Sequence, residues 1–393
     1  MSKLVPETKR TLIAALFDRD VVDSDLWEYD DYFESFDAEI QFLNDLRVLR
    51  SLGCTFQDGR LVEIALRAAP EMRQTPAAQQ GSILDILEND SEIGLPVDGD
   101  EEKKAVMRHA LDSVVRLWLM IDPAPDETRH RQGWRGERRL CDFVYGLFYP
   151  GKPAPEFPVL EGNSTRDPDL AAEMAMENTQ LQSSLTHPLT AANMNKLTSI
   201  TMDWIALIDR HLEFDADYRV LSVFSHNRWL IDALYMVQTW RAKHEPSAAA
   251  TGITGSQSQA LKPQVCPFPI PLEVIEETIK SLNLLFPHYN TPTNRFLRKH
   301  NKRLYLFRLR GHGHARDRAG SKVRLREFTF YHDRLIELAQ EFINPPKDWN
   351  TIFRDYRNPI QYWTFWLGLV IFLATVASVA LAAAQVYYGQ HSM

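Results

Sequence analysis

Cysteine is scarce in this chain, with three residues in 393, at Cys54, Cys141 and Cys266. Three dispersed cysteines cannot build a disulfide framework, and their spacing matches no zinc motif. We expect them to be small buried side chains without a base partner. An excess of basic residues is lacking too, because 44 Lys and Arg stand against 52 Asp and Glu. The resulting net charge of −8 argues against a nucleic-acid-binding protein.

The common signatures of enzymes and nucleotide-binding proteins are also absent. The sequence has no P-loop, no Gly-Xaa-Gly-Xaa-Xaa-Gly after a strand and no His-Glu-Xaa-Xaa-His. It also lacks the Gly-Xaa-Ser-Xaa-Gly turn of hydrolases and the protein-kinase motifs. These absences leave enzymatic activity open but favour a protein without one.

Two short patterns resemble metal-binding loops and are better explained otherwise. Gly311-His312-Gly313-His314 offers two histidines but no nearby Cys or carboxylate, which is typical of a basic loop. Asp98-Gly99-Asp100-Glu101-Glu102 begins like a calcium loop but lacks the Gly and Glu at the required offsets. We interpret it as a loop followed by the acidic first turn of a helix. We therefore expect no cofactor and no metal site.

Asp209 and His211 are the only catalytic candidates, and the pattern around them is weak. Asp203 and Asp217 lie nearby in the sequence, and carboxylates beside a histidine can form an acid–base site. The same spacing is typical of polar residues on one face of an amphipathic helix. We favour that second interpretation and expect a helix through this region.

Long apolar runs are missing with one exception, from Tyr362 to Ala384, which contains no charged residue. About 20 apolar residues in a helix cross a hydrocarbon core of about 30 Å. The run is flanked by aromatic residues, which are typical of membrane–water interfaces: Tyr362, Trp363 and Trp366 at one end, and Tyr387 and Tyr388 at the other. The pattern predicts a transmembrane helix over 359–386. A core helix of a soluble protein is the alternative, although such helices normally carry a polar face.

The charges beside this run predict its orientation. Arg354 and Arg357 precede it, and no Lys or Arg follows Ala384. The positive-inside rule then places the N-terminal part in the cytosol. Because the N-terminal region has no apolar signal segment, we expect a single-pass, tail-anchored protein in an intracellular membrane such as the endoplasmic reticulum. The lipid bilayer would be its first partner.

The rest of the chain predicts a mainly α-helical body. Apolar residues recur at helical spacing in five windows, at 106–121, 197–211, 230–240, 272–286 and 328–342. Residues 304–309 are the best strand candidate. We expect an N-terminal helical domain at 1–244 with a loop at 151–168, a Pro/Ser/Gly-rich linker at 245–271, a basic membrane-proximal region at 272–358, the transmembrane helix at 359–386, and a short far-side tail at 387–393.

Charge is segregated along the body. Between Asp18 and Asp45, eleven acidic residues and interleaved aromatics stand against Arg19 alone, whereas basic residues dominate from Arg295 to Arg326. The basic block is consistent with a solvated face, with docking to the acidic segment, or with contact to an anionic leaflet. The residues that would make the lipid or partner contact are Arg298, Lys299, Lys302, Arg303, Arg308 and Arg310. For the acidic segment we expect helices whose aromatic side chains point inward.

Two further partner predictions follow. Small residues in the apolar run permit close helix approach, so a homo-oligomer is one expectation: Gly368, Ala374, Ala377 and Ser378. Nucleic acid is not expected, because aromatics that could stack on bases are sparse in the basic block.

Six distinctive motifs occur in the N-terminal and C-terminal parts of the chain: Phe268-Pro-Ile-Pro-Leu-Glu-Val-Ile-Glu-Glu-Thr278, Leu284-Leu-Phe-Pro287, Tyr331-His-Asp-Arg-Leu335, Asp355-Tyr-Arg-Asn-Pro-Ile-Gln-Tyr-Trp-Thr-Phe-Trp366, Leu26-Trp-Glu-Tyr-Asp-Asp-Tyr-Phe33 and Phe42-Leu-Asn-Asp-Leu-Arg-Val-Leu49. They resemble a group of filamentous-fungal membrane proteins that have no assigned activity. The resemblance implies a fungal source, a tail-anchored protein and, by association only, an accessory role in secondary metabolism.

We expect a non-enzymatic scaffold or interaction protein at an intracellular membrane. The alternative is an enzyme, or an enzyme accessory, that acts on an apolar metabolite within a helical body. A deep apolar pocket near Asp209 and His211 would favour the alternative, and a filled core there would count against it.

Overall fold

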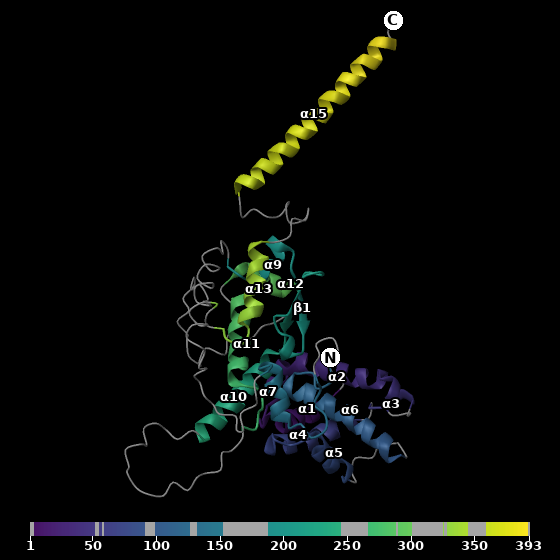
Figure 1. Ribbon diagram of the computed structural model, residues 1–393, viewed down its shortest axis with the longest axis vertical. Coiled ribbons are helices and arrows are strands. Elements are labelled where there is room, and N and C mark those ends of the chain that lie inside the picture. Colours follow the sequence, from purple (N-terminus) through teal and green to yellow (C-terminus); the bar gives the residue numbers. More distant parts are fainter. Residues whose placement is uncertain are drawn as a thin grey trace, which may run out of the picture.

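The computed structural model describes residues 4–51, 55–56, 59–90, 99–125, 132–151, 188–244, 266–287, 290–300, 325, 328–344 and 359–391. The described residues are mainly helical, with few strands, and they end in one long apolar helix. The expected fold class is therefore confirmed. Figure 1 shows the packed body and the separate C-terminal helix that extends away from it.

The first part of the body is a cluster of helices around α6. Its elements are α1 (Pro6–Phe17), the 3₁₀ helix η1 (Asp23–Tyr29), α2 (Asp30–Asp45), α3 (Arg47–Ser51), α4 (Arg60–Gln74), α5 (Gln80–Glu88), α6 (Asp100–Leu119) and α7 (Leu140–Phe148). Helices α2, α4 and α5 all pack against α6, and α4 also packs against α1. The expected apolar stripe from Val106 to Ile121 is fully buried at these contacts, which explains why α6 is the centre of the cluster.

Both ends of α6 follow from local chemistry. Asp100, Glu101 and Glu102 form its first turn, as expected, where negative charge stabilises the exposed N–H groups. The helix ends at Leu119 because Met120 adopts the left-handed conformation, with φ of 52°, and its N–H bonds the carbonyl of Arg116. The helix therefore stops before it reaches Pro123.

The second part of the body combines helices with a small sheet. Its elements are α9 (Ala191–Thr198), β1 (Thr201–Ile205), the 3₁₀ helix η2 (Ile208–Arg210), β2 (Phe214–Asp215), β3 (Val220–Phe224), α10 (Asn227–His244), α11 (Leu272–Leu285), α12 (Thr291–Lys299) and α13 (His332–Ile343). Strand β3 lies in the middle of the sheet, parallel to β1 and antiparallel to β2. Helix α11 packs against α10, and both α12 and α13 pack against α9.

The helix expected at 197–211 is wrong. Helix α9 stops at Thr198, Ser199 turns the chain with φ of 57°, and residues 201–205 form β1. Met202 is buried between exposed Thr201 and Asp203, which is the alternation of a strand. The apolar residues of this window therefore belong to three short elements, the end of α9, β1 and η2, and their helical spacing does not reflect one continuous helix. Pairing with β3, which local sequence does not reveal, decides the conformation.

The other expected helices are present. The windows at 230–240 and 272–286 lie in α10 and α11, and the window at 328–342 lies mostly in α13, with Phe328 and Tyr331 buried just before its start. The strand candidate at 304–309 lies outside the described residues, as does the predicted linker up to residue 265. From Cys266 onward that segment is packed: Phe268 is buried and its ring meets those of Trp118 and Trp229.

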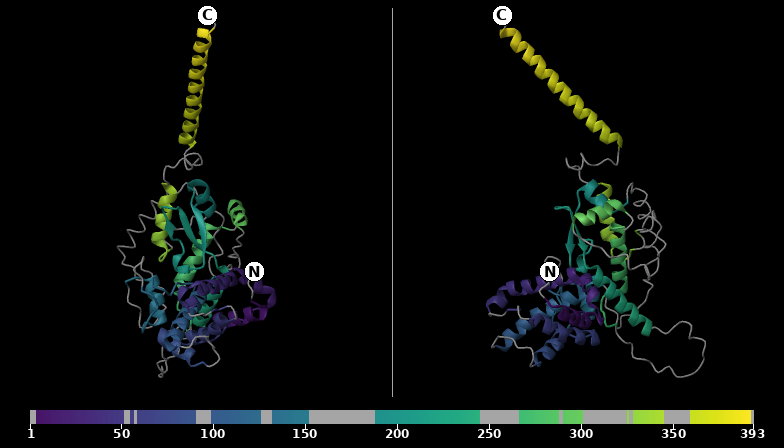
Figure 2. Two further views of the ribbon diagram at one scale, coloured as in Figure 1. Left: turned by 90° about the vertical axis from the view of Figure 1, so that its right-hand side faces the viewer. Right: turned by 180° about the vertical axis from the view of Figure 1, so that it is seen from behind.

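The last element, α15 (Pro359–His391), begins at the predicted residue, and a proline is well tolerated at the first position of a helix. Its stretch Trp363–Gln385 is long and apolar enough to cross a membrane, and none of it is buried against the body. Figure 2 shows α15 standing clear of the other elements in two further views. The alternative of a buried core helix is therefore wrong.

Candidate functional site

The most distinctive functional feature of the described residues is the exposed apolar surface of α15. Trp363 is 69% exposed at one end and Tyr387 is 57% exposed at the other. Trp366 and Tyr387 are separated by a helix length of about 32 Å, at about 1.5 Å per residue, which matches a bilayer core. Tyr362 and Tyr388 belong to the same helix, although their side chains lie outside the description. In water this surface would drive aggregation, whereas in a membrane it is satisfied.

The predicted small-residue surface also lies open along α15. Gly368 has no neighbouring atom within 4 Å of an added Cβ. Ala374, Ala377 and Ser378 are exposed. This part of the helix is therefore accessible to a second helix, and oligomerisation stays a prediction.

His211, one of the two weak catalytic candidates, is a fully buried structural histidine. Its Nδ1 accepts the backbone N–H of Phe224 at 3.1 Å, so its Nε2 carries the proton and meets the Ser281 hydroxyl at 2.6 Å. Burial, and to a smaller extent the nearby guanidinium of Arg334, lower its pKa to about 3. Because both ring nitrogens are engaged, the ring ties β3 to α11.

The surroundings of His211 are filled by other side chains. The ring of Tyr331 meets it edge-on at 5.1 Å, and the Tyr331 hydroxyl donates to the carbonyl of Ile208 at 3.2 Å. Arg334 binds the carbonyl oxygens of Asp209 and His211. Tyr331 is fully buried. These aromatic and hydrogen-bonding groups therefore pack directly around the histidine ring.

The carboxylates near His211 do not share a helix face, so that expectation is wrong. Asp203 is exposed on β1, Asp209 is buried in η2, and Asp217 is exposed in the turn between β2 and β3. The three residues therefore lie in a strand, a 3₁₀ helix and a turn, and not on one helix. Arg334 donates to the backbone carbonyl of Asp209 and also meets the Glu213 carboxylate at 3.7 Å.

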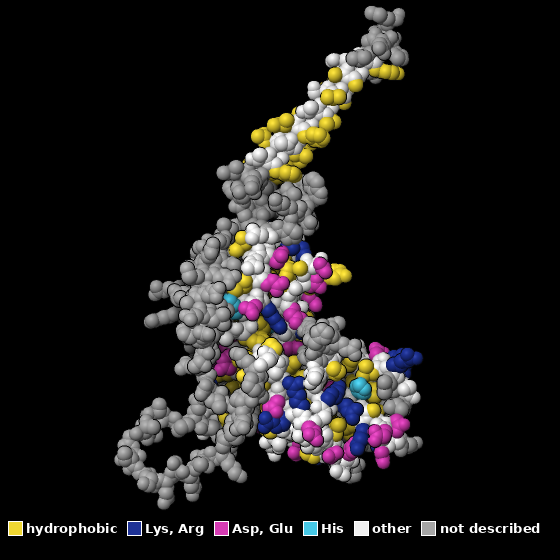
Figure 3. Space-filling model, viewed as in Figure 1, with side chains coloured by type: hydrophobic (Ala, Val, Ile, Leu, Met, Phe, Trp, Pro, Cys, Tyr) yellow, Lys and Arg dark blue, Asp and Glu magenta, His cyan; other side chains and the backbone are white. Residues whose placement is uncertain are grey.

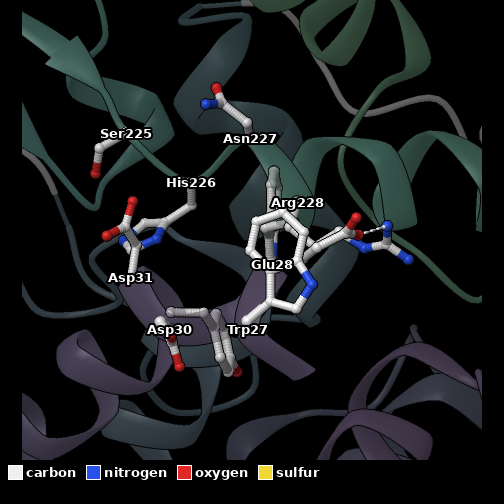
Figure 4. Close-up of a pocket in the computed structure, with 10 residues that line it drawn as sticks. Trp27, Glu28, Asp30, Asp31, Ser225, His226, Asn227 and Arg228 are labelled. Carbon is white, nitrogen blue, oxygen red and sulfur yellow. Dashed lines mark hydrogen bonds and ion pairs between the residues drawn. The ribbon is translucent and has the colours of Figure 1, made fainter. Parts of the chain in front are cut away.

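A pocket of about 170 Å³ lies between the N-terminal helices and the start of α10. Its walls come from η1, from the first turn of α2 and from the β3–α10 junction (Figure 4). The lining residues are Trp27, Glu28, Asp30, Asp31, Tyr32 and Ser225 to Trp229. Trp27 is 44% exposed, and the walls are polar rather than apolar. The pocket is too small and too polar for a large apolar metabolite.

A network of buried charged side chains connects the walls of this pocket. Arg228 forms an ion pair with Glu28, which Figure 4 draws as a dashed contact, and its Nε donates to the Tyr29 hydroxyl at 3.1 Å. The Tyr29 hydroxyl donates to Asp232 at 2.6 Å, and Asp232 also pairs with Arg19. Burial raises the pKa of Asp232, and the two guanidiniums only partly oppose this effect. The network joins α10 to η1 and to the segment that follows α1.

The histidine of the pocket has a structural role as well. His226 is buried, and its Nε2 lies 3.0 Å from the Ser35 hydroxyl. Its ring meets the rings of Tyr32 and Phe224 edge-on. His226 therefore anchors the start of α10 on α2.

Sequence reasoning missed this pocket because its two walls are far apart in the chain. Glu28 and Arg228 are separated by 200 positions. The only local signal is the acidic and aromatic run of the N-terminal segment. Its aromatics point inward as predicted, since Tyr29, Tyr32, Phe33 and Phe36 are buried.

The predicted basic contact residues fall into two groups. Arg298 and Lys299 are exposed at the end of α12, whereas Lys302, Arg303, Arg308 and Arg310 lie outside the described residues. The acidic segment has partners in other helices of the N-terminal part: Asp18 meets Arg73, and Glu39 pairs with Arg116. These contacts use basic residues outside the basic block.

Within the described part of the chain, no group of three His, Cys, Asp or Glu side chains could hold a metal ion. Gly311 to His314 and Cys54 lie outside it. Cys266 is buried, and burial raises its pKa to about 11, while Cys141 is only half-buried. The expectation of a buried cysteine therefore holds for Cys266.

Comparisons with known proteins return no matching family model, no similar curated protein and no similar solved structure. What the protein does must be inferred from its own residues.

Proposed function

We propose that this protein is a single-pass membrane protein that presents a helical interaction body on the cytosolic face of an intracellular membrane. The observation that carries the proposal is α15, whose stretch Trp363–Gln385 is apolar, long enough to span and wholly unburied. Its exposed aromatic ends support the same placement. The bilayer is the partner that would satisfy this surface.

Charge supports the orientation. Arg354 and Arg357 precede α15, and residues 359–393 contain no Lys or Arg. The positive-inside rule therefore favours a cytosolic body and a tail-anchored topology. The endoplasmic reticulum remains our proposal for the membrane, and the fungal origin and the pathway association remain predictions from the resemblance alone.

A non-enzymatic role is supported by the use of the buried polar groups. His211, His226 and Asp232 all join elements of the body to each other. The alternative, an enzyme for an apolar metabolite, required a deep apolar pocket near Asp209 and His211. The packed rings and hydrogen bonds in that region count against it.

The proposal is tested by placing one charge in the span. Leu373 is exposed near the middle of α15, and an arginine at a helix centre costs about 2.5–3.5 kcal/mol of insertion free energy. We expect the wild-type chain to resist alkaline extraction from membranes and Leu373→Arg to become largely extractable.

The matched control is Ile86→Arg, which changes an exposed apolar residue of α5 in the body. This variant should stay in the membrane pellet. Extraction of the wild-type chain, or equal release of both variants, would overturn the proposal.

A further inference from the structure

Helix α12 presents three cations on one face. Arg295, Arg298 and Lys299 follow the i, i+3, i+4 spacing that places side chains together on a helix surface, and all three are exposed. Thr293 and Leu297 are buried on the side that attaches the helix to the body. Among the described residues no carboxylate pairs with the three cations. We call Arg295, Arg298 and Lys299 the α12 surface.

The α12 surface lies at the end of the body from which the chain leaves for α15. Helix α12 packs on α9, and α9 packs on α13. Arg219 strengthens this end, because it binds the carbonyl of Thr198 at 2.9 Å and meets Glu341, in the last turn of α13, at 3.4 Å. Figures 1 and 2 show α9, α12 and α13 together at the end nearest α15.

Only a short segment of the chain connects α13 to α15. Helix α13 ends at Ile343 and α15 begins at Pro359. The chain between them can span at most about 58 Å even when fully extended, at about 3.3–3.6 Å per residue. An anchored body can therefore bring this end to the bilayer surface, where cations within about a Debye length are attracted to anionic lipid.

Exposed acidic residues lie on a different part of the same end of the body. Asp203 on β1 and Asp215 and Asp217 at the β2–β3 turn are exposed. Figure 3 shows acidic side chains clustered over the region where β1 lies. An anionic surface would attract the α12 surface and repel this turn, so the two features together specify one orientation.

We infer that the α12 surface binds the anionic headgroups of the leaflet in which α15 is anchored, and that this contact turns the β2–β3 turn away from the membrane. The inference rests on the proposed function, because it requires α15 to hold the body at the bilayer. It adds the chemistry of the partner, an anionic lipid surface, and the orientation of the body.

The test uses the full chain in nanodiscs of phosphatidylcholine, with or without phosphatidylserine. A fluorescent amino acid replaces Thr291, an exposed residue one turn before Arg295, or Asp217 at the β2–β3 turn. Lipids with a nitroxide on the headgroup quench a nearby probe. With phosphatidylserine we expect quenching at 291 to exceed that at 217 by at least about threefold, and to fall at high salt.

The double variant R295E/R298E should reduce quenching at 291 to the level at 217, while the matched control K103E/R108E, on exposed positions of α6, should leave it unchanged. Thermal unfolding of each variant checks that the body is intact. Equal quenching at both positions, or quenching that is the same without phosphatidylserine, would overturn the inference. Failure of the chain to enter the discs would instead contradict the proposed function.

Discussion

The body and α15 use apolar residues in opposite ways. In the body, large apolar side chains such as Trp118, Phe33 and Leu335 are fully buried, and charged groups lie around them or in paired networks. In α15, residues of the same kind, including Leu367 and Phe372, are more than half exposed. The apolar side chains of the body bury one another, whereas those of α15 need an apolar environment outside the protein. This difference predicts that mutations in the body change stability without releasing the protein from the membrane.

The largest effect of this kind is expected at Trp118. Its side chain is fully buried beside Phe268, and its carbonyl accepts the indole N–H of Trp229 at 2.8 Å. Trp118→Ala should lower the free energy of unfolding by about 3–5 kcal/mol. Thermal unfolding in detergent measures the loss, and alkaline extraction should show the variant still in the membrane.

Trp118→Phe provides the control for this change. Among the described residues the Trp118 Nε1 has no hydrogen-bond partner, so phenylalanine removes an unsatisfied donor as well as some apolar volume. Its cost should be well below that of alanine. If Trp118→Ala released the protein from membranes, the independence of the body and α15 would be refuted.

A somewhat smaller loss is expected at Asp232. Its carboxylate meets Arg19, Arg228 and the Tyr29 hydroxyl, and it is almost fully buried. Asp232→Ala removes the buried carboxylate that pairs with Arg19 and leaves Arg228 with Glu28 alone, so it should cost about 3 kcal/mol of unfolding free energy. Chemical denaturation of the full chain in detergent gives the value.

The exposed pair of Asp45 and Arg50 is the matched control for Asp232. These two side chains meet at 2.7 Å with most of their surface in solvent. Asp45→Ala should change stability by less than about 0.5 kcal/mol, because exposed pairs are screened. Equal losses at the two positions would show that the buried network does not hold α10 to the N-terminal helices.

The smallest effect is a pH dependence at His211. Its pKa is about 3 in the folded protein, below the ordinary 6.5, so the unfolded state binds the proton more readily. Stability from this residue is present above pH 6.5 and is lost as the pH falls toward 3. The loss should be about 2 kcal/mol at pH 5 relative to pH 7.5.

Denaturation at several pH values checks this contribution. His211→Gln, which cannot titrate, should show a flatter pH profile than the wild-type chain. A wild-type profile that is identical to that of the variant would mean that the ring is not held in its neutral form. The membrane association of α15 should not follow pH in either chain.

The sequence predicted the features that depend on local pattern. The stripes of α6, α11 and α13 follow helical periodicity over whole turns, and α15 follows from length and apolarity. The strand β1 was missed because its pairing partner β3 lies beyond η2 and β2. Local spacing at 197–211 cannot distinguish a helix from a strand that gains its stability from a distant neighbour.

The pocket could not be predicted for the same reason. Glu28 and Arg228 meet across 200 positions, and neither residue has a local sequence signature. His211 was proposed only as a weak catalytic candidate, and its burial and its contact with Ser281 depend on tertiary packing. Local sequence could suggest a polar group there and could not reveal that it links β3 to α11.

Protease protection of the full chain in sealed microsomes tests the central claim most directly, with one tag before α1 and another after α15. If α15 spans the membrane with the body in the cytosol, added protease should remove the body and the first tag and leave a protected fragment that carries the second tag. Loss of both tags without detergent, or protection of the body instead, would contradict the account.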